Sequence, residues 1–161
     1  MAEFEPAFSF MLPHEGGYVC DPNDPGGETR YGISQRTHPN LDIGNLSLDD
    51  ARAIYKQEFW DGVGYDQLTS QLIANKLFDL SVNMGSHEAV QLLQQACCDC
   101  AEPVAADGHL GPLTIAAANH AQEAQLLDSF RDRAEQFYRK LADRRPGLAK
   151  FLNGWIARAR A

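Results

Sequence analysis

Apolar residues recur at helical spacing along almost the whole chain, and this pattern constrains the fold more than any other feature of the sequence. The first repeat begins near Phe4, where Phe8, Met11 and Leu12 would share one face of a short helix ending at His14. Further helices are predicted over residues 47–59, 71–84, 86–100, 112–119 and 122–142, and after residue 147. Six to eight helices with little strand predict a mainly α fold.

One segment interrupts this pattern. From residue 18 to residue 45 the chain is rich in Gly, Pro, Asp and Asn, and residues 21–27 read Asp-Pro-Asn-Asp-Pro-Gly-Gly, which is typical of turns. Residues 30–34 are predicted to form a short extended piece. Because connections longer than about 15 residues are uncommon in compact domains unless they have a function, we expect this loop to be part of an active site.

The length and composition fit a single compact domain. With 161 residues, of which 44% are hydrophobic, the chain has enough apolar material for one core. We expect one domain over residues 1–161, in which residues 1–70 carry the first helix and the long loop and residues 71–161 form a helical lobe. No run approaches the roughly 18 apolar residues of a membrane-spanning helix. We therefore expect no stable membrane insertion. A monomer is also expected.

The net charge of −8 is unevenly distributed along the chain. Residues 131–161 carry nine Lys or Arg against three acidic residues, a net +6, whereas residues 1–130 carry −14. The basic end is either a solvated helix or an electrostatic contact for an anionic surface such as cell-wall polymer or lipid headgroups. The acidic remainder lacks a basic stripe with interleaved aromatic residues, so no nucleic-acid partner is expected.

The N-terminus and the cysteines indicate where the chain is made. The first six residues are acidic where a secretory signal would be basic, and the apolar stretch after them is too short for a signal core. We therefore expect synthesis in the cytoplasm without a signal peptide. Cys97, Cys98 and Cys100 are too crowded for mutual disulfides and lack the usual zinc-ligand spacing. We expect reduced thiols, and no metal or organic cofactor.

Glu15 is the strongest candidate for chemistry. It follows an apolar helix and precedes Gly16 and Gly17, so the negative end of the helix dipole and the apolar neighbours would both favour a protonated carboxyl group. A protonated carboxylic acid is the usual proton donor when a glycosidic bond is cleaved, and the two glycines leave room for a bulky sugar. Taken alone, a Glu at a helix end is more often a surface residue.

The long loop offers partners for Glu15. Asp21, Asp24 and Glu28 could each return near it and position a water molecule or stabilise the positive charge that develops on the sugar ring. Asp21 and Asp24 also precede prolines, where turn capping alone would explain them. Thr29 could hold a water molecule through its hydroxyl group.

Four further residues are candidates for binding a sugar. Tyr18, Tyr31 and Trp60 could stack on sugar faces, although each is also compatible with a place in the core. Asn83 stands at the end of an apolar helix. It could bind an acetamido group, or it could cap the helix just before Gly85.

Several sequence blocks carry a resemblance to a known family. Residues 14–18 read His-Glu-Gly-Gly-Tyr, residues 21–29 read Asp-Pro-Asn-Asp-Pro-Gly-Gly-Glu-Thr, and residues 31–34 read Tyr-Gly-Ile-Ser. These blocks, with residues 78–85, resemble glycoside hydrolase family 108, the N-acetylmuramidases found as phage-type endolysins and secretion activator proteins. Residues 107–114 and 154–155 resemble that family's C-terminal predicted peptidoglycan-binding region.

The resemblance implies a lysozyme-like helical fold with Glu15 as the catalytic acid. It implies hydrolysis of the β-1,4 bond between N-acetylmuramic acid and N-acetylglucosamine in peptidoglycan glycan strands, assisted by Asp24 and Thr29. The spacing from Glu15 to Asp24 matches the Glu–Asp–Thr arrangement of phage-type lysozymes, whereas Thr29 comes one residue early and Cys20 stands where Asn is expected. The site of action would be the periplasm or cell wall, reached through a holin or a secretion machinery.

Two alternatives stay open at this point. A lytic transglycosylase would need only one acid and would leave a 1,6-anhydro ring on its product. A non-catalytic wall-binding or secretion-accessory protein would keep the fold without the reaction. The sequence does not decide whether the reaction inverts or retains configuration, because that depends on the distance between the two carboxyl groups.

Overall fold

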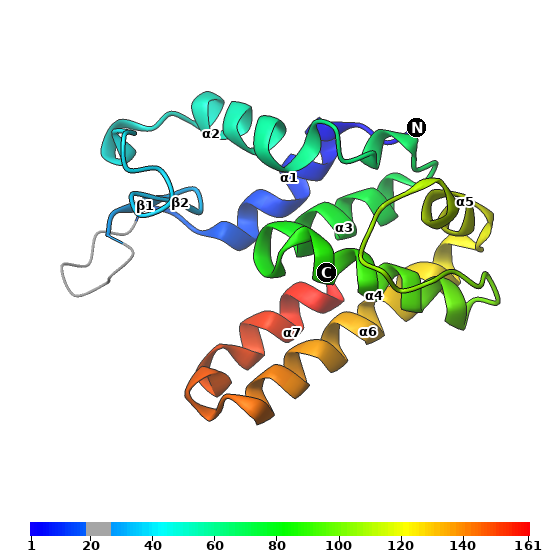
Figure 1. Cartoon of the computed structure of the whole chain (residues 1–161). Coiled ribbons are helices and arrows are strands. Elements are labelled where there is room, and N and C mark those ends of the chain that lie inside the picture. The colour runs from blue at the N-terminus through cyan, green and yellow to red at the C-terminus, as the bar shows by residue number, and fades with distance from the viewer. Residues whose placement is uncertain (19–26) are drawn as a thin grey trace.

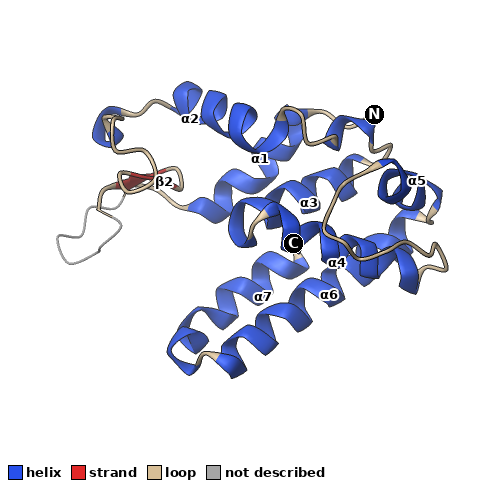
Figure 2. Cartoon of the chain, viewed as in Figure 1, coloured by secondary structure: helices blue, strands red, loops and turns tan. Residues whose placement is uncertain are grey.

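The computed structural model describes residues 1–18 and 27–161, and these form a mainly helical molecule with one small hairpin (Figure 2). The mainly α, lysozyme-like fold predicted from the sequence is therefore confirmed. The α-helices are α1 (Phe4–Glu15), α2 (Leu48–Tyr55), α3 (Gln71–Met84), α4 (Ser86–Asp99), α5 (Pro112–His120), α6 (Glu123–Arg144) and α7 (Leu152–Arg160). The other elements are β1 (Thr29–Arg30), β2 (Ile33–Ser34), η1 (Ile43–Asn45), η2 (Lys56–Trp60), η3 (Tyr65–Gln67) and η4 (Pro146–Phe151).

Local sequence signals account for most helix boundaries. Ser47 and Asp50 form a capping box at the start of α2, in which each side chain accepts a hydrogen bond from the other residue's backbone N–H. Ser70 accepts a hydrogen bond from the N–H of Ile73 at the start of α3. Gly85, with φ of 94°, ends α3. The helix predicted over residues 47–59 differs from expectation, because it is α-helical only as far as α2 and continues as the π-helical η2.

Helix α3 is the centre of the molecule (Figure 1). Helix α1 packs along it, and α4 and α6 pack on other faces, while α7 runs beside α6 in the opposite direction. Its residues 76–81 are all buried, and they include the charged side chains of Lys76 and Asp79. Because charged residues are seldom fully buried without partners, these two positions indicate an internal polar network.

The hairpin and helix α7 reach the same end of α1. Strands β1 and β2 pair antiparallel, with Thr29 opposite Ser34 and Arg30 opposite Ile33, so a two-residue turn connects them. Figure 1 shows the hairpin and α7 on the side of the molecule where α1 ends. Among the described residues, no helix is both long enough and apolar enough to cross a membrane.

Candidate active site

Glu15 is the last residue of α1, and its side chain is 16% exposed. The chain turns away at Gly16, whose φ is 75°. The carboxyl group lines a hollow of about 230 Å³, together with residues of the hairpin, of α2 and η2, and of α3. The remaining lining residues are Gly32, Ile33, Thr37, His38, Ile54, Tyr55, Glu58, Phe59 and Val82. Glu15 is therefore partly shielded from water and still accessible from the hollow.

The hairpin turn lies directly against the Glu15 carboxyl group. Tyr31 and Gly32 both have positive φ, 52° and 79°, as a two-residue hairpin turn of the primed type requires. A Cβ atom at Gly32 would lie 2.6 Å from Oε2 of Glu15 and 2.5 Å from the hydroxyl of Tyr55. Only glycine therefore fits here without displacing one of these groups.

Tyr55 fixes the turn from the side of α2. Its hydroxyl donates a hydrogen bond to the carbonyl of Tyr31 over 2.9 Å. Burial first, and then the nearby charge of Glu15, raise the pKa of the Tyr55 phenol. Tyr55 therefore stays protonated and keeps its role as donor.

A buried ionic network holds the other oxygen of Glu15. Nη2 of Arg158, from α7, lies 2.5 Å from Glu15 Oε1 and 2.9 Å from Asp79 Oδ1, while Nε of Arg158 donates to the same Asp79 oxygen over 3.0 Å. His14 Nδ1 lies 2.9 Å from Asp79 Oδ1, and Lys76 Nζ donates to the carbonyl of Arg158 over 2.7 Å. Arg158 thus bridges two carboxyl groups.

The surroundings of Arg158 keep its guanidinium group positively charged. Burial works against the charged guanidinium, but the charge of Asp79 and its hydrogen bonds, followed by Glu15, outweigh burial and raise the pKa of Arg158 above its usual value. Asp79 is 0% exposed, and its Oδ2 has no hydrogen-bond partner within the described part of the chain. The expected apolar surroundings of Glu15 therefore contain an arginine that sequence reasoning missed.

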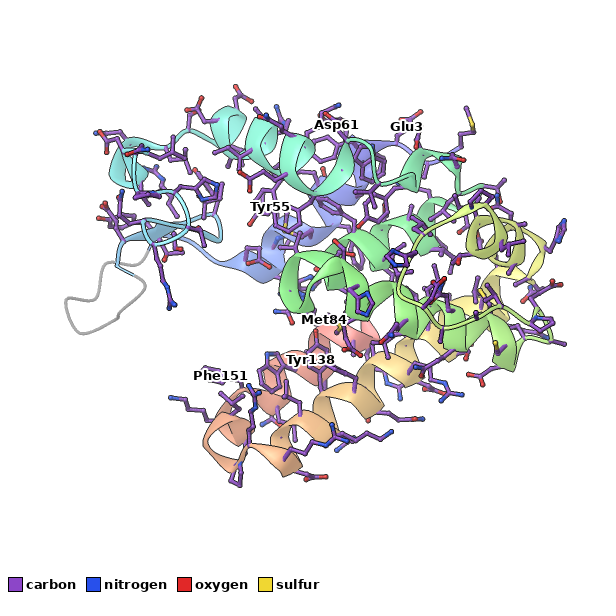
Figure 3. All side chains as sticks on the ribbon, viewed as in Figure 1. Glu3, Tyr55, Asp61, Met84, Tyr138 and Phe151 are labelled. Carbon is purple, nitrogen blue, oxygen red and sulfur yellow. The ribbon has the colours of Figure 1, made fainter. Side chains whose placement is uncertain are left out.

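A second hollow, of about 240 Å³, includes Arg158 in its lining. It is lined by His14, Asn83, Phe151, Gly154, Trp155 and Arg158. The Trp155 ring stacks on Tyr138 at 5.3 Å and lies 5.8 Å from the ring of Phe151, which is 47% exposed. Figure 3 shows Phe151 and Tyr138 on this side of the molecule. Aromatic faces next to polar groups are typical of sugar-binding surfaces.

Asn83 lines this second hollow, and a hydrogen bond fixes the orientation of its side-chain amide. Its Oδ1 accepts a hydrogen bond from the Tyr138 hydroxyl over 2.6 Å. The Nδ2 group makes no hydrogen bond to the described residues, and Asn83 is exposed. The amide can thus donate to a ligand.

The first hollow contains a second carboxyl group that the sequence did not single out. Glu58, from η2, lines it together with Glu15 and is 44% exposed. His38 Nε2 lies 2.9 Å from Glu58 Oε1.

The other candidate residues from the loop lie at different places in the structure. Thr29 lies in β1 opposite Ser34 and is not among the residues that line the two hollows. Tyr18 is 52% exposed and donates a hydrogen bond to Glu28. The Tyr31 ring lies under the guanidinium of Arg30, 5.4 Å from its centroid. The candidates Asp21 and Asp24, and also Cys20, fall outside the described residues.

Trp60 does not have the place expected for a sugar-stacking residue. It is 7% exposed, and its ring stacks on Tyr65 at 5.0 Å inside an aromatic cluster with Phe4 and Phe78. This prediction is corrected by the structure, because the ring packs against Phe4 of α1 and Phe78 of α3 and is covered by them. Trp155 occupies the kind of position that was expected of Trp60.

Two other sequence features have structural roles. The loop at residues 107–111 is built around the buried side chain of Gln94, which donates to Asp107, Thr114 and the carbonyl of His109, and accepts from the N–H of Gly108. The thiols of Cys97, Cys98 and Cys100 are free.

Comparisons with known proteins find two family regions along the chain. Residues 8–85 match the family model described as glycosyl hydrolase 108. The N-terminal half of the chain belongs to that family. Residues 88–160 match the predicted peptidoglycan domain. Among solved structures, SagA of Brucella abortus is 26% identical, with a TM-score of 0.77 and coverage of 98% of this chain and 89% of that chain. A comparison with curated proteins finds no significant match.

The two family regions indicate the class of reaction and the polymer on which the protein acts. The family 108 region indicates a glycoside hydrolase, and the peptidoglycan region indicates peptidoglycan as the partner. The protein therefore has a peptidoglycan-hydrolysing or peptidoglycan-binding role, with a site of action at the cell wall. The boundary between the regions falls between residues 85 and 88, so that Glu15, Gly32 and Asp79 come from the first region and Arg158 from the second.

Proposed function

We propose that this protein is an N-acetylmuramidase that hydrolyses the β-1,4 bond between N-acetylmuramic acid and N-acetylglucosamine, with Glu15 as general acid. The observation that carries the proposal is the place of Glu15. It is partly buried, it lies at the open edge of one hollow, and through Arg158 it adjoins a second hollow with exposed aromatic rings. A glycan lying across both hollows would pass over this carboxyl group.

The two oxygens of Glu15 have different surroundings, which suits proton donation. Arg158 holds Oε1, whereas Oε2 faces the backbone of Gly32 at the edge of the hollow. Proton transfer from Oε2 to the bridging sugar oxygen would release the leaving sugar as positive charge develops on the neighbouring ring. A carboxylate on the opposite side must then position water or stabilise that charge. Asp24, with Thr29 holding water, remains our proposal for this role, and Asp21, Glu28 and Glu58 are the other candidates.

The second hollow would bind sugar residues on one side of the cleaved bond. Trp155 and Phe151 offer ring faces to a pyranose, and the Nδ2 group of Asn83 can donate to an N-acetyl carbonyl. On the other side of the site, Tyr18 and Tyr31 remain candidates for stacking. This assignment gives both N-acetylated sugars a place next to Glu15.

The test compares Glu15→Gln with wild type on purified peptidoglycan, followed by mass spectrometry of the soluble products. We expect a loss of at least about 1,000-fold in the rate of muropeptide release, since the amide cannot donate the proton. Glu5→Gln is the matched control, because Glu5 lies on the same helix with a side chain that is 63% exposed. Its activity should equal that of wild type.

The products separate the proposal from its alternatives. Free reducing ends on N-acetylmuramic acid support hydrolysis, whereas products lighter by one water would identify a lytic transglycosylase. Binding of peptidoglycan with no product from either wild type or Glu15→Gln would identify a non-catalytic wall-binding protein. An undiminished rate in Glu15→Gln would refute the assignment of Glu15.

A further inference from the structure

Arg158 is the one described cation that bridges Glu15 and a second, fully buried carboxyl group. We propose that Arg158 and Asp79 form a positioning device for Glu15, in which Arg158 fixes the carboxyl group of the acid and Asp79 compensates the charge of Arg158. This inference rests on the proposed function of Glu15. It also makes the C-terminal peptidoglycan region part of the reaction site.

The contacts of Arg158 require the shape of an arginine side chain. A planar guanidinium can contact two carboxyl groups at once, here Oε1 of Glu15 at 2.5 Å and Oδ1 of Asp79 at 2.9 Å through the same Nη2. A lysine ammonium is a compact point charge that would favour one partner. With Oε1 held, rotation of the Glu15 carboxyl group is restricted, and Oε2 stays at the hollow.

The charge balance gives Asp79 its role. A lone cation 2.5 Å from Glu15 would strongly favour the ionised carboxylate, which cannot act as an acid. Oδ1 of Asp79 accepts a hydrogen bond from Nε of Arg158 and lies 2.9 Å from Nη2, and Nη2 donates a hydrogen bond to the Asp79 carbonyl over 3.3 Å. Most of the charge of Arg158 is thus compensated before Glu15 is considered.

Other groups around Arg158 and Asp79 do not reverse this compensation of the Arg158 charge. Tyr55 and Tyr138 remain protonated, because burial raises the pKa of both phenols. Lys76 contacts the carbonyl of Arg158 and not Glu15. The titratable and charged groups that face the network are His14 on α1, Tyr55 on α2, Glu58 on η2 with its partner His38, Lys76 and Asp79 on α3, Arg131 and Tyr138 on α6, and Arg158 on α7.

The experiment measures kcat and KM against pH on soluble, uncrosslinked glycan strands. Since a general acid must be protonated, activity falls on the alkaline side of the profile. In Arg158→Gln the cation is lost, so the alkaline limb should move to higher pH by about one unit. In Asp79→Asn the cation is uncompensated, so the limb should move to lower pH by about one unit. Opposite shifts follow from the charge balance and not from a merely structural role.

The size of kcat tests positioning separately. Because a displacement of about 1 Å can reduce a rate about 100-fold, Arg158→Gln should lower kcat by 10- to 100-fold with little change in KM. Arg158→Lys keeps the charge, so its alkaline limb should stay near that of wild type while kcat falls. Arg160→Gln is the matched control, since Arg160 lies on the same helix but pairs with Glu135 and Asp132 at the surface. It should leave both readouts unchanged.

The outcomes distinguish this inference from the proposed function. If Glu15→Gln retains activity, the assignment of the acid fails. If Glu15→Gln is inactive but the limbs of Arg158→Gln and Asp79→Asn move in the same direction or not at all, the positioning device alone is refuted. Should Arg158→Gln not fold, Asp79→Asn still decides, because an unmoved or raised limb in that variant overturns the inference.

Discussion

Replacing Gly32 by Ala is the most direct test of the geometry around Glu15. The new methyl group would lie 2.6 Å from Oε2 of Glu15 and 2.5 Å from the Tyr55 hydroxyl, against the 3.4 Å of an ordinary contact. One or both groups must therefore move by roughly 0.8 Å. Since a misplacement of about 1 Å can cost about 100-fold in rate, we expect kcat to fall by about 30- to 100-fold.

The same substitution should reduce stability by a calculable amount. Alanine at a φ of 79° costs about 1–2 kcal/mol relative to glycine. Displacing Tyr55 weakens its hydrogen bond to the Tyr31 carbonyl, which contributes about 1 kcal/mol. The free energy of unfolding should therefore fall by about 2–3 kcal/mol in a urea titration.

Gly62 offers a matched control for the backbone contribution. Its φ is 78°, and a Cβ atom there would have no neighbour within 4 Å. Gly62→Ala should therefore lose only the 1–2 kcal/mol of backbone strain and should digest soluble glycan strands at the wild-type rate. Equal kcat values for Gly32→Ala and wild type would refute the argument that this turn confines the acid.

Three further predictions concern the rest of the molecule. Trp155→Ala should raise KM about tenfold with kcat little changed, whereas Trp60→Ala should cost about 3–5 kcal/mol of stability in urea; the reverse pattern would exchange their roles. Burial lowers the pKa of Lys76 from 10.5 to about 8, so the unfolded state binds more protons between these values and stability should rise with pH there, by up to about 1.4 kcal/mol per unit. That pH dependence should be absent in Lys76→Met, and equal free energies of unfolding of the wild type at pH 8 and pH 10, measured by urea titration, would contradict the burial argument. Because burial raises the pKa of the Cys97 thiol to about 12, iodoacetamide at pH 8 should label the exposed Cys98 before Cys97, and labelling of Cys97 as early as Cys98 in peptide mass maps would disprove its protection.

Features set by neighbouring residues were predictable from the sequence. The Ser47 cap and the end of α3 at Gly85 depend on contacts within a few residues. The place of Glu15 at the end of an apolar helix belongs to the same class. These features were visible because hydrophobic spacing and turn chemistry act locally. The extended piece predicted over residues 30–34 is instead a hairpin, because the chain turns at Tyr31 and Gly32.

The partners of Glu15 were not predictable in this way. Arg158 is separated from Glu15 by 143 positions in the sequence. It lies on a helix whose other basic residue of the last turn, Arg160, is at the surface. Asp79 stands in an apolar helix where the spacing of its neighbours shows burial but not the identity of a partner. Trp60 and Trp155 illustrate the same limit, because aromatic rings of α1 and α3 cover one ring while η4 and α7 leave the other at a hollow.

The position of Arg158 bears on how the two family regions relate to each other. A chain ended near residue 85 would keep Glu15 and the hairpin but would lose Arg158 together with α4, α6 and α7. In the intact chain, removal of the Arg158 side chain alone would leave Asp79 buried without this cation, and breaking a buried ion pair in this way costs about 3–5 kcal/mol, a large fraction of the stability of a domain of ordinary size. The loss would also free Oε1 of Glu15. We therefore expect that the peptidoglycan region is not a separable anchor added to a finished catalytic unit, since its last helix supplies the cation that pairs with Asp79 and holds Oε1 of Glu15.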